Sequence, residues 1–179
     1  MGTTTTLVTV QEFLALPEIE GQRIELIGGE VVSMSSGGRP HEFAKSNVNR
    51  LLIARLLQNR PGRVLIETGF QLDEYNALIP DLSYVSKDPG VPGAPGAIQG
   101  APDLAIEVVS SESAARLSKK VGLYLAHGSK SVWVVFPEEQ KVWIYAPGQA
   151  REFQREQTLE DPDVLPGFRA SVSAIFQGI

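Results

Sequence analysis

The sequence of 179 residues contains no cysteine, which excludes disulfide bonds and every metal site built on thiolate ligands. It contains only two histidines, His41 and His127, and they are too far apart in the sequence to favour a histidine-rich metal cage. No apolar run approaches the roughly 20 residues that a helix needs to span a bilayer. The first residues, MGTTTTLVTVQEF, lack the basic and apolar segments of a secretory signal. We therefore expect a cytoplasmic protein without a membrane partner.

The sequence also lacks an excess of basic residues, because 16 Lys and Arg stand against 21 Asp and Glu and give a formal net charge of −5. This balance disfavours a protein that coats nucleic acids in general. It leaves room for an enzyme that binds a phosphate backbone through a local basic patch. The 42% hydrophobic and 21% charged residues are typical of a soluble globular protein, and the length suits one core. We expect one domain over residues 1–179.

Local signals predict a short helix and a hairpin near the N-terminus. Thr9 and Glu12 match a Ser/Thr-x-x-Glu capping box, and Pro17 would end the helix that follows. In residues 23–34, two strands flank a Gly-Gly pair, which a type I′ turn favours. The later elements expected are a helix at 41–59, strands at 63–72, 80–86 and 102–110, a helix at about 113–127, and strands at 131–137, 141–147 and 151–156.

The connections between these elements predict a mixed sheet. The segment 87–100 is too rich in Gly and Pro for a helix, so the strands on either side of it should be antiparallel neighbours. The helix at 113–127 allows a parallel crossover between the strands that flank it. The expected fold class is α/β or α+β, with a mixed central sheet flanked by helices.

Two neighbouring strands open with the same dipeptide, Pro-Asp, at Asp81 and Asp103, and the second carries Glu107 within the apolar run LAIEVV. Because alternate side chains share a face, Asp103 and Glu107 point the same way, toward a possible cleft. They lie about 13 Å apart along the strand, too far to share an ion. Asp81 would lie about 5 Å from Glu107 across an antiparallel pair. Such carboxylates repel unless a proton or a cation lies between them, and Mg²⁺ suits oxygen ligands.

Each carboxylate also has a simpler explanation. An aspartate after proline often caps a turn, which is the interpretation we favour for Asp103 and leave equally open for Asp81. A glutamate within a strand usually faces solvent. The combination of Asp81 with Glu107, rather than either residue alone, predicts a metal site.

The helix at 113–127 adds a cation to this picture. Leu117, Val121 and Tyr124 form an apolar stripe at helical spacing. At about 100° per residue, Lys120 lies beside this stripe and Lys119 lies nearly opposite, in solvent. Lys120 can lay its stem along the packed face and direct its ammonium group at the sheet. It would then stand beside a metal-bound phosphate, with an ordinary surface lysine as the alternative.

The segments RIELIGGEVV, His41, PDLSYV, PDLAIEVVS, KKVGLYLAHG, VWVVFP and VLPGF, in this order, resemble the Uma-two family of the PD-(D/E)xK nuclease superfamily. The resemblance covers about residues 8–176 and implies a restriction-endonuclease-like αβββαβ core with an N-terminal helix and β-hairpin. It implies that Asp81 and Glu107 are the acidic residues of the signature and that Lys120 is its lysine, displaced from position 109 to the helix. It also implies DNA as substrate, Mg²⁺ or Mn²⁺ held by Asp81 and Glu107, and a homodimer.

The chain departs from the family pattern at two places. EVVSSES replaces the usual EVLSPS, which affects the turn into the helix, and Arg116 stands where an aspartate is common, which alters the charge around Lys120. By analogy with the superfamily, Glu25 is preferred to Glu30 as a further acidic site residue. A solvated hairpin carboxylate is the simpler explanation. His41 could cap the long helix or contact a phosphate, although a histidine at a helix start is usually structural.

Two functions stay open. The first is a metal-dependent endonuclease, in which the ion polarises the scissile phosphate and Lys120 orients a water or offsets developing charge. The second is a nuclease-fold module with little or no activity that acts in nucleic-acid or protein binding. Candidates for contacts with the DNA backbone are Arg39, Lys45, Arg50, Arg55, Arg116 and Lys119.

Overall fold

The computed structural model describes residues 7–17, 23–34, 37–58, 61–87 and 97–179. Its helices are α1 (Val10–Leu14), α2 (Arg39–Leu56), α3 (Ala114–Ala126) and α4 (Val172–Ile175). Its strands are β1 (Arg23–Ile27), β2 (Glu30–Met34), β3 (Arg63–Ile66), β4 (Gly69–Gln71), β5 (Ala77–Leu78), β6 (Leu82–Val85), β7 (Ala97–Gln99), β8 (Leu104–Val108), β9 (Ser131–Phe136), β10 (Lys141–Ala146), β11 (Gln149–Phe153), β12 (Thr158–Leu159) and β13 (Ala170–Ser171). No helix in these ranges is long and apolar enough to cross a membrane.

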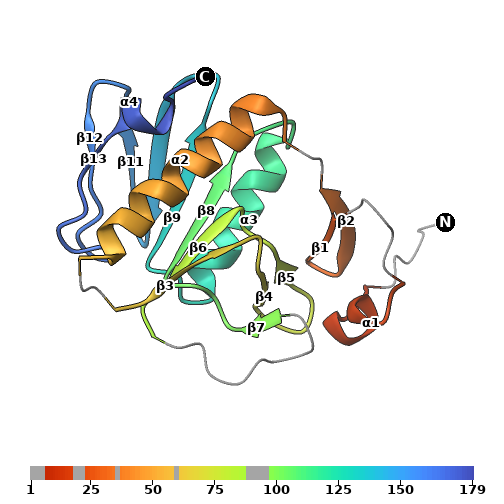
Figure 1. The fold of residues 1–179 in the computed structure, drawn as a ribbon. Coiled ribbons are helices and arrows are strands. Elements are labelled where there is room, and N and C mark those ends of the chain that lie inside the picture. Colours follow the sequence, from red (N-terminus) through yellow and green to blue (C-terminus); the bar gives the residue numbers. More distant parts are fainter. Residues whose placement is uncertain (1–6, 18–22, 35–36, 59–60, 88–96) are drawn as a thin grey trace.

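The larger sheet has six strands in the order β11-β10-β9-β8-β6-β3, with α2 on one face and α3 on the other (Figure 1). Strands β6 and β8 pair antiparallel, and β8 and β9 pair parallel across α3. Both pairings confirm the sequence prediction, as does the mixed α+β class. Residues 109–113 connect β8 to α3, and α3 forms the crossover from β8 to β9.

Strand β8 is buried on both faces, which explains why LAIEVV is so apolar. Leu104 and Ile106 pack into the core under α2, and Ala105 packs into the core under α3. The prediction that the face shared by Asp103 and Glu107 lines a cleft is therefore wrong for most of the strand, because Ala105 on that face is buried. It holds only at the C-terminal end, where Glu107 borders a pocket.

The second sheet has five strands in the order β2-β1-β5-β4-β7, and the predicted hairpin forms one edge of it. Gly28 and Gly29 have φ values of 62° and 77°, the positive values that a type I′ turn requires. Ile27 of β1 packs in the same apolar cluster as Val121 and Tyr124 of α3. The capping box at the start of α1 is also confirmed.

The predicted strand at 63–72 is wrong as a single element. It divides into β3, in the larger sheet, and β4, in the smaller one. Between them Glu67 has φ of 48°, a left-handed conformation that strains a residue with a side chain. The short elements β5, β7, β12, β13 and α4 were not predicted, because they are too brief to show a periodic pattern. Most of the segment 87–100 and the end of the helix expected at 41–59 lie outside the described residues.

Candidate functional site

Asp81 and Glu107 come together at one end of the β6–β8 pair. Leu82 pairs with Ile106, so Asp81, the residue before β6, lies beside Glu107. The Val108 N–H donates to Asp81 Oδ2 at 2.7 Å, and both carboxylates are buried. The antiparallel register thus gives the proximity that the sequence predicted.

Asp103 lies apart from this pair and has a structural role. Its Oδ2 accepts hydrogen bonds from the Ser86 N–H at 2.7 Å and the Ser86 hydroxyl at 2.8 Å. Its Oδ1 lies 2.8 Å from Lys130 Nζ. The turn-capping interpretation of Asp103 is therefore confirmed.

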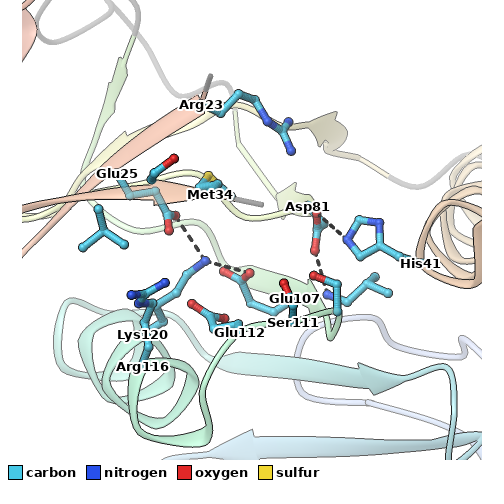
Figure 2. Close-up of a pocket in the computed structure, with 14 residues that line it drawn as sticks. Arg23, Glu25, Met34, His41, Asp81, Glu107, Ser111, Glu112, Arg116 and Lys120 are labelled. Atoms are coloured by element: carbon cyan, nitrogen blue, oxygen red, sulfur yellow. Dashed lines mark hydrogen bonds and ion pairs between the residues drawn. The ribbon is translucent and has the colours of Figure 1, made fainter. Parts of the chain in front are cut away.

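Lys120 points into the space between two carboxylates, as Figure 2 shows. Its Nζ lies 2.8 Å from Glu107 Oε2 and 3.1 Å from Glu25 Oε1, and the side chain is only 2% exposed. The Tyr124 hydroxyl donates to Glu107 Oε1 at 2.9 Å, so protein donors engage both oxygens of Glu107. Lys119 is exposed, as predicted, although its Nζ also lies 3.3 Å from the Ile27 carbonyl oxygen of the hairpin.

Glu25 is one of the least exposed residues of the site, so the interpretation as a solvated hairpin carboxylate is wrong. Its Oε1 accepts from the Ile79 N–H at 2.7 Å in addition to its contact with Lys120. The reason is the short strand β5, whose Ala77 pairs with Leu26 and places the following residues against β1. Glu30, at the start of β2, is exposed.

His41 lines the same pocket, although the sequence analysis favoured a structural role for it and did not place it beside Asp81. Its Nε2 lies 3.2 Å from Asp81 Oδ1, and its Nδ1 lies 3.1 Å from Glu42 Oε1. The side chain is buried. A signal was present, because position 41 shares a helical face with the apolar residues Ala44, Val48 and Leu52.

The side chains that line a pocket of about 160 Å³ include Glu25, His41, Asp81, Glu107 and Lys120. Three more charged side chains line it: Arg23 of β1, Arg116 of α3, and Glu112, which precedes α3 (Figure 2). Of the six predicted DNA-contacting cations, Arg116 alone lines this pocket; Arg23 was missed because it becomes a site residue only through the sheet pairing of β1. Lys45 instead binds Glu42 and Glu67.

The electrostatics of the site are set by burying several carboxylates around one ammonium group. Burial raises the pKa of Glu107 to about 8, with Lys120 opposing the shift and the charges of Glu25 and Asp81 adding to it. Burial alone would lower the pKa of Lys120, but Glu107 and Glu25 raise it above its ordinary value. Burial would also raise the pKa of Asp81, but His41, the Val108 N–H and Lys120 together bring it below its ordinary value. Of the paired carboxyl groups Asp81 and Glu107, Glu107 is therefore the one whose protonated form is favoured near neutral pH.

This arrangement predicts that a Glu107→Gln variant becomes increasingly more stable than the wild type as pH rises. In the folded protein Glu107 stays protonated up to about pH 8, whereas the unfolded chain loses this proton near 4.5. The stability that this proton contributes is thus complete below pH 4.5 and is lost as pH approaches 8. Glutamine is neutral throughout, so the difference should grow by on the order of 1 kcal/mol per pH unit across this window. Urea unfolding at pH 5, 6.5 and 8 with chelator measures it, and a constant difference would contradict the assignment.

Residues 10–173 of the chain match the Uma2 family model, which is described as "Putative restriction endonuclease". Among solved structures, the chain is similar to a crystal structure of a protein from Anabaena variabilis ATCC 29413, described as "a putative nuclease belonging to DUF820". The TM-score is 0.82 at 25% sequence identity, over 94% of this chain and 97% of that one. The comparison with curated proteins finds no match.

Proposed function

We propose, from the premise that the chain belongs to the Uma2 family, that it is a metal-dependent endonuclease that hydrolyses phosphodiester bonds of DNA. The observation that carries the proposal is the placement of Lys120 Nζ 2.8 Å from Glu107, beside Asp81, in one pocket. Two carboxylates and a buried amine at one site are a set of groups suited to phosphoryl chemistry. The nuclease fold of the structural neighbour supports the same reaction class.

The carboxylates suit a hard divalent cation. Within the described ranges, no three His, Asp or Glu side chains gather in a group that could hold a metal ion by themselves. Mg²⁺ commonly uses one or two carboxylates together with water and substrate phosphate, so Asp81 and Glu107 are sufficient. Burial is the main cause of the raised pKa of Glu107, and the charges of Glu25 and Asp81 add to it, so a cation bound beside these carboxylates would favour the ionised form. Asp81 and Glu107 would therefore hold Mg²⁺ or Mn²⁺.

Lys120, Arg23 and Arg116 would supply the positive charges that act on the substrate. Bound at this site, a divalent ion would polarise the scissile phosphate and lower the pKa of a water molecule. The Lys120 ammonium, fixed by Glu25 and Glu107, would orient that water and offset the charge that develops on the phosphate. Arg23 and Arg116 line the same pocket and would attract the backbone phosphates.

The proposal predicts that purified protein cleaves DNA with Mn²⁺ or Mg²⁺ and that chelator stops the reaction. The assay should cover linear, supercoiled and single-stranded DNA, because the site does not define the form of the substrate. The Glu107→Ala protein, purified in parallel, should be inactive and so excludes a contaminating nuclease. Equal cleavage by both proteins, or cleavage by neither, would favour a nuclease-fold module that acts in binding.

Homodimerisation and a single domain over residues 1–179 stay predictions of this proposal. The edge strand β11 offers a place for self-association, since its outer side has no partner strand among the described residues. Unprotected edges tend to pair with a second chain.

A further inference from the structure

His41 has no role in the reaction as proposed, yet its side chain extends from the first turn of α2 to Asp81 at the site. It is only 6% exposed, and its two ring nitrogens lie 3.2 Å from Asp81 Oδ1 and 3.1 Å from Glu42 Oε1. A buried ring with both nitrogens engaged by carboxylates has a fixed orientation.

We propose that His41 is a positioning residue that fixes the Asp81 carboxylate for metal binding, an inference that rests on the proposed function. Asp81 Oδ2 is held by the Val108 N–H at 2.7 Å, and Oδ1 is held by His41. These donors come from two different elements, β8 and α2, so together they fix the rotation of the carboxylate. The lone pairs that they leave free are available to the pocket, which both Asp81 and His41 line.

His41 is itself held by a ring of contacts that returns to Asp81. Glu42 Oε1 accepts from Lys45 Nζ at 2.9 Å, and Lys45 Nζ also donates to Glu67 Oε1 at 2.8 Å. The Glu67 N–H then donates to the Asp81 carbonyl oxygen at 3.2 Å. This network of hydrogen bonds and ion pairs thus contacts both the side chain and the backbone of Asp81. It also gives a reason for the strained conformation of Glu67, which places its N–H and its carboxylate in one network.

The backbone before α2 is shaped around the His41 ring. A Cβ atom on Gly37 would lie 2.1 Å from Nδ1 and 2.2 Å from Cγ of His41, far inside van der Waals contact. A Cβ on the adjacent Gly38 would meet nothing closer than Pro40 Cδ at 3.9 Å. Gly37→Ala therefore displaces the ring without removing any polar group, and Gly38→Ala is its matched control.

The test is calorimetric titration with Mn²⁺ of the wild type and of His41→Ala, His41→Gln, Gly37→Ala and Gly38→Ala. Removing a hydrogen-bond partner that orients a metal ligand typically costs about 10-fold to 100-fold in metal affinity. We expect His41→Ala and Gly37→Ala to lose affinity on that scale and Gly38→Ala to match the wild type. His41→Gln should stay within about threefold, because its amide nitrogen can replace Nε2 as the donor to Asp81. With DNA, His41→Ala should lower kcat and leave KM nearly unchanged.

Two results would overturn the inference while leaving the proposed function in place. If His41→Gln loses Mn²⁺ as completely as Asp81→Asn, the histidine is a ligand and not a positioning residue. If His41→Ala binds Mn²⁺ like the wild type, its role is structural only. A wild-type protein that binds no Mn²⁺ would remove the proposed function and this inference together. Thermal melting of each variant excludes unfolding as the cause, and Gly37→Ala, compared with Gly38→Ala, serves if His41→Ala does not fold.

Discussion

Replacing Lys120 by methionine is expected to lower the rate of DNA cleavage by a factor of about 10² or more, the usual loss when one positioned electrostatic group is removed. Methionine keeps a long unbranched side chain in the packed position but removes the ammonium group that lies between Glu25 and Glu107. Mn²⁺ binding should stay nearly intact, because lysine is not a metal ligand and the loss of its repulsion offsets the further rise in the Glu107 pKa that follows the loss of its charge. Single-turnover cleavage and calorimetric titration measure the two quantities separately.

Lys119→Met is the matched control for this experiment. Lys119 is adjacent, identical in chemistry and exposed, and its ammonium group contacts the Ile27 carbonyl oxygen of the hairpin and not the carboxylates. It should cleave at nearly the wild-type rate, with a modest loss of DNA affinity that depends on salt concentration. An inactive Lys119→Met, or full activity in both variants, would contradict the role given to Lys120.

The distinction between these two lysines could be predicted from the sequence because a helix has a fixed geometry. About 100° per residue is enough to decide which of two adjacent side chains follows the apolar stripe. The pairing of Asp81 with Glu107 was also predictable, since a connection without a helix favours antiparallel neighbours. In both cases the information lies within one element or in the link between two consecutive elements.

The burial of Glu25 and the contact of His41 with Asp81 could not be predicted, because each depends on the packing of distant segments. Glu25 is buried by the chain that follows β5, a strand of only two residues that leaves no periodic signal. His41 reaches Asp81 only because α2 packs across the face of β8. The break at Glu67 likewise divides the strand expected at 63–72 between two sheets. Local propensity carries no information on such packing.

Replacing Asp81 by asparagine is expected to abolish measurable Mn²⁺ binding and to lower cleavage by about 10³-fold, at the upper end for loss of one electrostatic group. The amide keeps an oxygen that can accept from the Val108 N–H, so the β6–β8 contact should survive. What is lost is the negative charge of Asp81, while burial, the main cause of the raised pKa of Glu107, still favours the protonated form of Glu107 in the variant. One protonated carboxyl and one amide make a poor site for a hard cation.

Asp103→Asn tests whether this effect belongs to the site or to the Pro-Asp motif in general. Both aspartates follow a proline at the start of a strand, but Asp103 is occupied by Ser86 and Lys130. Its replacement should leave Mn²⁺ affinity and cleavage unchanged and cost only some stability, because the hydrogen bonds from Ser86 are weaker to an amide than to a carboxylate. Loss of Mn²⁺ binding in Asp103→Asn equal to that in Asp81→Asn would mean that the ion lies elsewhere on β8. Retention of binding in both would mean that neither aspartate holds it.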